Sequence, residues 1–240
     1  MDHVAIVTGG TRGIGAAIAE KLRDDGVKVV ANYGGNDEAA QKFTDQTGIA
    51  HGKWNVADYD ACHEGVAKVE AEHGPVTILV NNAGITRDGT LLKMDRQMWE
   101  DVIDVNLGGC FNMSKAVFPK MKEQGFGRIV SIGSINGQGG QYGQVNYAAA
   151  KSGIHGFTKA LAQEGARFNV TVNALAPGYI DTDMVAAVPE PVLEKIVAKI
   201  PVGRLGQAEE IARGVAFLCG EDAGFVTGST LSINGGQHMY

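Results

Sequence analysis

Short apolar runs alternate along the chain with amphipathic segments of helical period. The first run, residues 3–8, has no polar alternation and is typical of a strand that is buried on both faces. Strands that alternate with helices predict a parallel sheet with right-handed crossovers and helices on both faces. The expected strands are 3–8, 27–33, 49–54, 77–80, 128–132, 170–175 and 230–233. The expected helices are 16–25, 38–47, 58–73, 95–122, 147–167 and 208–219.

Length and composition fit one α/β domain that covers residues 1–240. The chain is 44% hydrophobic and 20% charged, which is typical of a soluble globular protein with a large core. Four of the six prolines lie between 177 and 201, around the amphipathic segment 192–200. We therefore expect residues 178–206 to form an insertion that acts as a mobile substrate lid.

Charge and cysteine usage exclude several classes of protein. The net charge of −6, without a basic cluster, argues against a nucleic-acid surface. The cysteines, Cys62, Cys110 and Cys219, are far apart and form neither a disulfide framework nor a zinc motif, which favours a cytoplasmic location. No histidine motif indicates a metal, and no apolar run approaches the ~20 residues of a membrane span.

A glycine-rich turn, Thr-Gly-x-x-x-Gly-x-Gly, follows the first strand at residues 8–15 and leads into a helical pattern. Glycines let the backbone approach a pyrophosphate, and a helix N-terminus offers free N–H groups to anionic oxygens. The spacing differs from the usual Gly-x-Gly-x-x-Gly fingerprint, so a simple tight connection remains an alternative. The candidate cofactor contacts in this turn are Gly9, Thr11, Arg12, Gly13, Ile14 and Gly15.

The second strand ends in the neutral residues Asn32 and Tyr33. An acid at that point binds the ribose hydroxyls of NAD, whereas a 2′-phosphate needs a neutral position and a nearby cation. Arg12 in the glycine-rich turn could supply that cation, so NADP is favoured; the alternative is that Arg12 is only solvated.

Polar turns also follow the third and fourth expected strands, at the sheet edge where a cofactor would lie. The second of them, Asn-Asn-Ala-Gly at 81–84, could by itself be a bare turn. The candidate cofactor contacts in these turns are Asn55, Val56, Asn82, Ala83 and Gly84.

Asn106 lies inside the long helical pattern 95–122, where asparagine has poor propensity. We expect a local bulge or a buried hydrogen bond to compensate.

The residues most suited to acid–base chemistry lie between 134 and 151. Tyr147 and Lys151 share a helix face, and a cation beside a phenol favours the phenolate. Ser134 follows an expected strand, at the edge where α/β proteins assemble their sites. Taken alone, a Tyr-x-x-x-Lys pair is also typical of an ordinary surface helix.

The chain resembles the short-chain dehydrogenase/reductase family in motifs that span its whole length. They are the glycine-rich turn 8–15, Asn-Asn-Ala-Gly at 81–84, Asn106, Ser134, Tyr-x-x-x-Lys at 147–151 and Asn-x-x-x-Pro-Gly at 173–178. The resemblance implies a Rossmann-type, doubly wound sheet of seven parallel strands, a nicotinamide cofactor and a symmetric homotetramer. It adds as cofactor contacts Tyr147, Lys151, Pro177, Gly178, Ile180 and Thr182.

The resemblance also implies a catalytic tetrad. Tyr147 would protonate the substrate carbonyl oxygen, and Ser134 would donate a hydrogen bond to the same oxygen. Lys151 would hold the nicotinamide ribose and favour the phenolate, while Asn106 would anchor a water that leads protons to Lys151. A non-catalytic NADPH-sensing relative is the remote alternative, although such proteins typically lack the tyrosine or the lysine.

Within the family, the chain is most similar to NADPH-dependent reductases of short 3-oxoacyl-CoA thioesters in polyhydroxybutyrate synthesis. Reductases of carrier-protein thioesters in fatty acid synthesis are the alternative. Phe168 stands near a position where those enzymes often have an arginine for docking an acidic carrier, although Arg128 and Arg167 could serve. Gly133 replaces a serine of many relatives. The candidate substrate contacts are Asp88, Lys93, Gln141, Tyr142, Gln144 and Tyr179.

Overall fold

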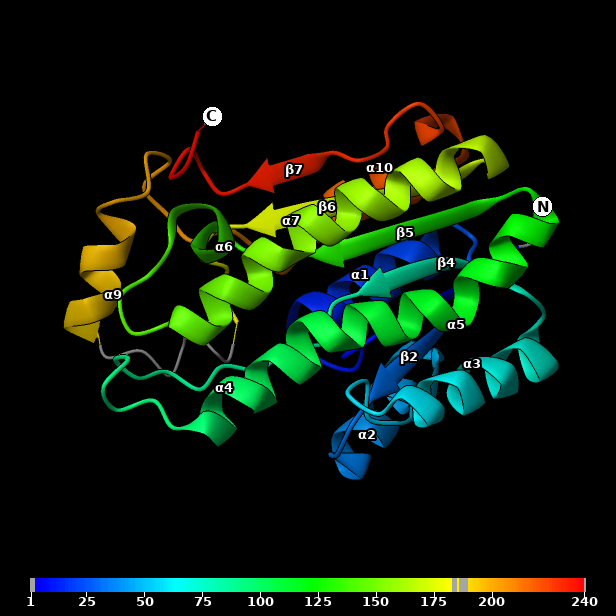
Figure 1. Ribbon diagram of the computed structural model, residues 1–240, viewed down its shortest axis with the longest axis horizontal. Helices are drawn as coiled ribbons and strands as arrows, with labels where there is room; N and C mark the ends of the chain where they lie inside the picture. The colour runs from blue at the N-terminus through cyan, green and yellow to red at the C-terminus, as the bar shows by residue number, and fades with distance from the viewer. Residues whose placement is uncertain (1–2, 183–184, 186–189, 240) are drawn as a thin grey trace.

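A computed structural model describes residues 3–182, 185 and 190–239, and contains one seven-stranded sheet with every strand parallel (Figure 1). The strand order is β3-β2-β1-β4-β5-β6-β7, which confirms the doubly wound α/β prediction. The strands are β1 Val4–Val7, β2 Lys28–Tyr33, β3 Ala50–Lys53, β4 Val76–Asn81, β5 Gly127–Ile132, β6 Val170–Pro177 and β7 Thr230–Ile233.

Helices cover both faces of the sheet, with α3, α5 and α7 in front of it and α1, α2 and α10 behind it in the view of Figure 1. The α-helices are α1 Gly13–Asp24, α2 Asp37–Thr47, α3 Tyr59–His73, α4 Arg96–Ile103, α5 Gly109–Gln124, α6 Ile135–Gly139, α7 Val145–Gly165, α9 Glu190–Val197 and α10 Ala208–Cys219. Two 3-10 turns are η2 Ala166–Phe168 and η3 Glu221–Ala223.

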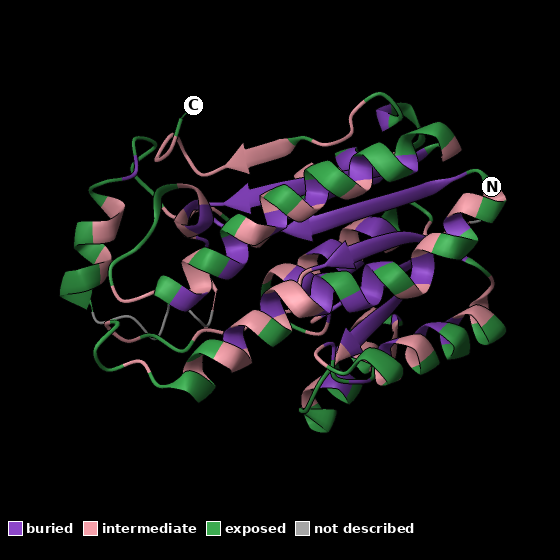
Figure 2. Ribbon diagram, viewed as in Figure 1, coloured by how far each residue is buried: buried purple, intermediate pink, exposed green. Residues whose placement is uncertain are grey.

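Alternate residues of β1 enter two different cores. Val4 and Ile6 pack with α3 and α5, whereas Ala5 and Val7 pack with α1 and α10. All four side chains are buried, and Figure 2 shows the central strands buried between helices that are exposed only on their outer faces. The unbroken apolar run follows from this burial, because a parallel strand covered on both faces has no solvent side.

The strand order reverses between β1 and β4, and the two strand ends are joined there by side-chain hydrogen bonds. The Thr8 Oγ1 accepts from the backbone N–H groups of Asn82 (2.9 Å) and Ala83 (3.0 Å). The Asn82 side chain donates in return to the carbonyls of Thr8 (2.9 Å) and Gly9 (3.2 Å). The glycine-rich turn and the Asn-Asn-Ala-Gly turn therefore form one unit at the switch point, where doubly wound sheets bind ligands.

The long helix expected over 95–122 is interrupted at Asn106. A π-helical turn, Asp104–Gly108, separates α4 from α5, and the fully buried Asn106 lies within it. Its amide donates to the Ile85 carbonyl (3.0 Å) and accepts from the Ile85 N–H (2.8 Å). The structure thus contains both the bulge and the buried hydrogen bond expected to compensate for this asparagine.

The segment after Ser134, expected to be a loop, begins with the short helix α6. Ser134 is the N-cap of α6 and accepts from the Asn136 N–H (3.1 Å), which satisfies one of the free N–H groups of the helix. Glycines obscure the helix in the sequence because their propensity is poor, but the cap and the packing of Gly137 against Lys151 stabilise it.

Chemical features outside the sheet are few. Cys62, Cys110 and Cys219 are all buried and unpaired. Burial is the main cause that raises the pKa of the Cys62 thiol to about 12. Within the described ranges, no helix is long and apolar enough to cross a membrane, and the His, Cys, Asp and Glu side chains form no cluster that could hold a metal ion.

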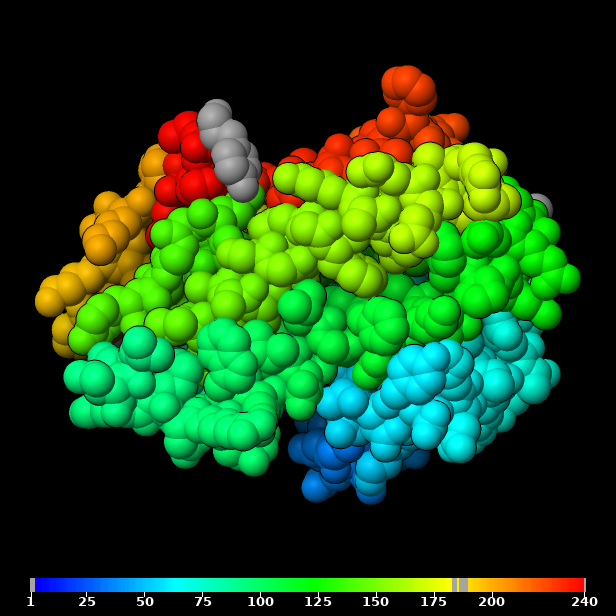
Figure 3. Space-filling view, viewed as in Figure 1, coloured from blue at the N-terminus to red at the C-terminus, as the bar shows by residue number. Residues whose placement is uncertain are grey.

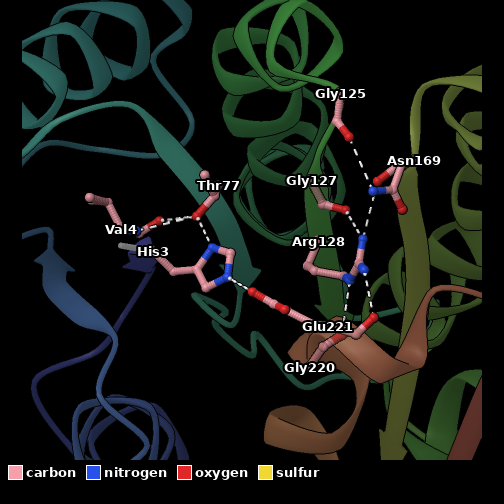
Figure 4. Close-up of polar contacts among 9 residues, drawn as sticks. All are labelled: His3, Val4, Thr77, Gly125, Gly127, Arg128, Asn169, Gly220 and Glu221. Atoms are coloured by element: carbon pink, nitrogen blue, oxygen red, sulfur yellow. Dashed lines mark hydrogen bonds and ion pairs between the residues drawn. The ribbon is translucent and has the colours of Figure 1, made fainter. Parts of the chain in front are cut away.

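Arg128 is buried at the start of β5, at the sheet edge opposite the switch point (Figure 4). Its guanidinium donates to the carbonyls of Gly127, Asn169, Gly220 and Glu221, at distances of 2.9–3.2 Å. The group also lies 4.2 Å from the Phe126 ring centre, and its burial lowers the pKa of Arg128. Arg128 therefore joins β5, β6 and η3, and it is not a surface cation that could dock a carrier protein.

We expect Arg128→Met to lower the free energy of unfolding by about 2–4 kcal/mol, because it leaves several buried carbonyls without a donor. Urea denaturation followed by circular dichroism measures the loss. Arg167→Met is the matched control, since Arg167 is exposed and should change stability by no more than ~0.5 kcal/mol. Equal small effects in both variants would contradict this account of Arg128.

Candidate active site

Tyr147 and Lys151 lie one turn apart on α7, at the carboxyl edge of the sheet. The Lys151 Nζ is 5.6 Å from the Tyr147 ring centre. Lys151 is only 4% exposed, and its ammonium donates to the Ile132 carbonyl at the end of β5 (2.7 Å). The described part of the chain offers it no carboxylate partner. Two of its three donors are thus left for other polar groups.

Asn106 and Lys151 meet beside Gly84, in the turn after β4. A Cβ atom at residue 84 would lie 3.2 Å from the Asn106 Oδ1 and 3.6 Å from the Lys151 Nζ. Glycine at this position keeps the space in front of the ammonium open. The buried ammonium, with free donors that face open space, suits the hydroxyl groups of a ribose.

Ser134 is nearly buried, at 9% exposure, and lies at the end of β5. Its oxygen accepts from the Asn136 N–H, which leaves its own hydrogen free to donate to a ligand. Ser134 follows the end of β5 in the chain. The Lys151 ammonium donates a hydrogen bond to the carbonyl of Ile132, the last residue of that strand. The structure therefore brings the four predicted catalytic residues to one region of the sheet edge.

The glycine-rich turn has the shape needed to approach a pyrophosphate. Gly9 and Gly13 have positive φ angles of 60° and 53°, which side-chain-bearing residues rarely adopt. A Cβ atom at Gly15 would lie 2.2 Å from the Gly9 carbonyl oxygen, so only glycine fits there. Arg12 is the N-cap of α1 and is exposed. Thr11 and Ile14 are half-buried beside it. These residues fit a dinucleotide cofactor, whose phosphates the first N–H groups of α1 would meet.

The end of β2 differs from the expectation. Asn32 is 1% exposed, and its amide donates to the Trp54 carbonyl (2.9 Å), so this side chain serves the fold. Tyr33 is half-buried; burial, followed by a hydrogen bond to Asp37, raises the pKa of its hydroxyl. Lys53, which pairs with Tyr33 in the β2–β3 register, forms an ion pair with Asp37 (2.8 Å).

Sequence reasoning missed Asp37 and Lys53 at this edge. Both are exposed and lie beside Tyr33, where the adenosine ribose of a bound dinucleotide would be expected. The position of Lys53 next to the end of the expected strand 49–54 was the available signal, because ligand contacts gather at strand ends. Asp37 gave no such signal, because it is the first residue of α2 and not the last residue of β2.

The other cofactor candidates fall into two groups. Thr182 lies across from the glycine-rich turn, since its Cγ2 would be 3.8 Å from a Cβ atom at Gly13. Ile180 is buried, and Pro177 and Gly178 form the end of β6 and the turn after it. By contrast, Asn55 caps its own turn by accepting from the Ala57 N–H (3.1 Å), and the Val56 side chain lies in the core.

The substrate candidates differ in their exposure and in the bonds that they already make. The Gln144 amide donates to Asp88 (2.9 Å) and accepts from Asn136 (2.9 Å), so both of its ends are already paired. Tyr142 is 86% exposed, and Gln141 and Lys93 are also exposed. Tyr179 and Ile200 line a small cavity of about 100 Å³, together with Ile233 at the end of β7.

A family model described as Enoyl-(Acyl carrier protein) reductase matches residues 9–238. The chain belongs to the short-chain dehydrogenase/reductase family, and it is an oxidoreductase that uses a nicotinamide cofactor.

Individual relatives match over their full lengths. The chain is 61% identical over 240 residues to the acetoacetyl-CoA reductase of Rhizobium meliloti (strain 1021), which covers 100% of both chains. It is 52% identical over 243 residues to the acetoacetyl-CoA reductase of Cupriavidus necator, with 99% of each chain covered. The 3-oxoacyl-[acyl-carrier-protein] reductase of Escherichia coli (strain K12) is 48% identical over 239 residues, 98% of this chain and 97% of the relative.

We expect Tyr147→Phe to lower the rate of carbonyl reduction by the ~10²–10⁴-fold that general acid–base catalysis supplies. The reason is that phenylalanine keeps the ring but removes the proton. The affinity for the reduced cofactor, measured by fluorescence titration, should be nearly unchanged. Tyr59→Phe, on the exposed face of α3, is the control. A Tyr147→Phe variant that keeps more than a tenth of the activity would show that another group is the acid.

Proposed function

We propose that this protein is an NADPH-dependent acetoacetyl-CoA reductase that forms (R)-3-hydroxybutyryl-CoA for polyhydroxybutyrate synthesis in the cytoplasm. The main support is the full-length identity of 61% with a relative of that name, in a chain whose four candidate catalytic residues share one sheet edge. The (R) configuration and the pathway are proposed by analogy with the family. A small-molecule thioester is the substrate in this proposal, and neither nucleic acid nor membrane is a partner.

The catalytic roles are those that the family resemblance implies, and the positions of the side chains are compatible with them. A bound NADPH supplies hydride to the carbonyl carbon. Ser134 donates a hydrogen bond to the carbonyl oxygen and stabilises the charge that develops there. Tyr147 gives that oxygen its proton, which makes the hydroxyl group of the product. The Lys151 ammonium favours the phenolate left behind and binds the ribose hydroxyls with its free donors.

Asn106 has a supporting role. Its side chain holds the turn after β4 through Ile85, which keeps Gly84 in front of Lys151. We propose that it also keeps a water in place through which Lys151 and then Tyr147 regain a proton. A non-catalytic NADPH sensor would oxidise no NADPH with any ketone, so a simple assay separates that alternative.

The carrier-protein alternative remains the second candidate because the Escherichia coli relative has that activity in its name. The burial of Arg128 weakens it, since one of two arginines considered for carrier docking is enclosed by carbonyls. The other, Arg167, is exposed beside Phe168, with its guanidinium 4.7 Å from the ring centre.

We further propose that residues 1–240 act as one domain and that the segment 178–206 covers the substrate. Residues 183–184 and 186–189 of this segment lie outside the described residues. Its two ends are joined by backbone hydrogen bonds from Asp181 to the Gly206 carbonyl (2.8 Å) and from Gly206 to the Tyr179 carbonyl (2.9 Å). These bonds hold the two ends of the segment together.

Assays with 3-oxoacyl-CoAs of four, six and eight carbons test the substrate. We expect kcat/KM to fall by roughly tenfold or more from four to eight carbons, because methylenes that find no apolar trough clash with the site. The four-carbon acyl-carrier-protein thioester is the comparison substrate. A preference that rises with chain length, or activity only on carrier-protein thioesters, would favour the alternative in fatty acid synthesis.

We expect Arg12→Ala to raise the KM for NADPH by roughly tenfold and to change that for NADH by less than about twofold, because only NADPH carries a 2′-phosphate. Steady-state kinetics with both cofactors measure the difference. Lys28→Ala, which removes an equal charge from the exposed opposite end of β2, is the control. Similar effects on both cofactors would mean that Arg12 does not bind the 2′-phosphate.

We propose a homotetramer, and expect light scattering to give about four chain masses at micromolar concentration. Helices α4, α5 and α7 lie next to one another in the space-filling view (Figure 3). They carry Trp99, Phe111 and Val145, which are 40–49% exposed. Phe111→Glu should weaken assembly by placing a charge in an apolar contact. A stable wild-type monomer would exclude the tetramer.

A further inference from the structure

Asn146, the residue before Tyr147, is completely buried, and each of its side-chain polar atoms is paired. Its Nδ2 donates to the carbonyls of Arg87 (3.0 Å) and Met98 (2.9 Å). Its Oδ1 accepts from the backbone N–H of Tyr147 (2.8 Å). One amide therefore connects the start of α7 with the loop after β4 and with α4.

The bond to Tyr147 matters because the first N–H groups of a helix have no partner within the helix. Gln144, the N-cap of α7, gives no side-chain cap bond. Asn146 supplies an acceptor to the N–H of Tyr147 itself, so the backbone that carries the phenol is fixed at the helix end, where fraying would otherwise begin.

The loop after β4 is joined to the same segment by further bonds, which together we call the strap: residues 87–89 with residues 143–146. The Gly89 N–H donates to the Gly143 carbonyl (2.8 Å), and the Gln144 amide donates to Asp88. Gln144 also accepts from Asn136, whose N–H in turn donates to Ser134. Asn146 lies at the end of the strap nearest Tyr147. Through Gln144 and Asn136, the strap is also connected with Ser134.

Only a side chain with two donors and one acceptor in a plane can make the three bonds of Asn146. Aspartate keeps the acceptor but replaces the NH2 group with one oxygen, which would face both carbonyl oxygens. Serine has a single donor, and leucine has none. Because the group is fully buried, no water replaces a lost bond without a rearrangement of the strap.

We propose that Asn146 is a positioning residue for the reaction, which sets the Tyr147 hydroxyl relative to Ser134 and Lys151 by fixing the backbone of Tyr147 against the strap. The inference rests on the proposed function and deepens it. Asn146 contacts neither substrate nor cofactor in this account, so its effect belongs to the proton-transfer step and not to binding.

The test compares Asn146→Ala and Asn146→Asp with Asn173→Ala in acetoacetyl-CoA reduction. Both Asn146 variants should lower kcat by about 10–100-fold, since a misplacement near 1 Å can cost ~10²-fold. The KM for acetoacetyl-CoA and the Kd for NADPH should stay within about twofold. Asn173 is a matched control: it is 1% exposed in β6 and bonds the Val226 carbonyl (2.7 Å) and the Ser229 N–H (3.1 Å), so its loss weakens the fold elsewhere.

Thermal unfolding by circular dichroism identifies the temperature at which all variants are folded, and kcat is compared there. Asn146→Asp keeps the acceptor for the Tyr147 N–H, so the two variants separate the loss of the donated bonds from the loss of all three bonds. An Asn146 variant that keeps more than half of the wild-type kcat would overturn the proposal, as would an equal loss of kcat in Asn173→Ala. A wild-type protein without reductase activity would instead contradict the proposed function.

Discussion

The candidate site depends on one buried positive charge, the ammonium of Lys151. Taking an ammonium from water into a protein interior costs several kcal/mol unless polar groups surround it. Among the described residues, a backbone carbonyl at the end of β5 is its one hydrogen-bond partner, and no carboxylate forms an ion pair with it. A carboxylate would satisfy the lysine fully. Its absence among the described residues leaves the ammonium with donors to share with a ligand.

The surrounding elements are arranged to keep that charge both enclosed and accessible. The π-helical turn places Asn106 against the turn after β4, and glycine at residue 84 leaves space in front of the ammonium. At the opposite edge of the sheet, Arg128 is also buried without a carboxylate in direct contact, but there four carbonyls use its donors. The two cations show the difference between a charge that stabilises the fold and one that remains free for chemistry.

Much of the fold could be predicted because its signals are local. The last helix and strand match their expected ranges, 208–219 and 230–233, and Asn106 stood out in sequence because it opposed the helical pattern around it. Pairings between distant residues could not be predicted. An arginine in a strand is normally solvated, so nothing in the sequence indicated the burial of Arg128. Likewise the amide of Gln144 suited a ligand in sequence, but it bonds Asn136 and Asp88, which are brought near only by folding.

The interlocked turns at the switch point have a consequence for the kinetics of cofactor binding. Because the Asn82 amide already holds the carbonyls of Thr8 and Gly9, the phosphate-binding backbone is preorganised before any ligand arrives. Little conformational entropy then remains to be lost on association, so encounter with the cofactor need not wait for the turn to order. A loop that became ordered only on binding would bind the cofactor more slowly. With a preorganised turn, the discrimination between cofactors depends on the few side chains around that turn.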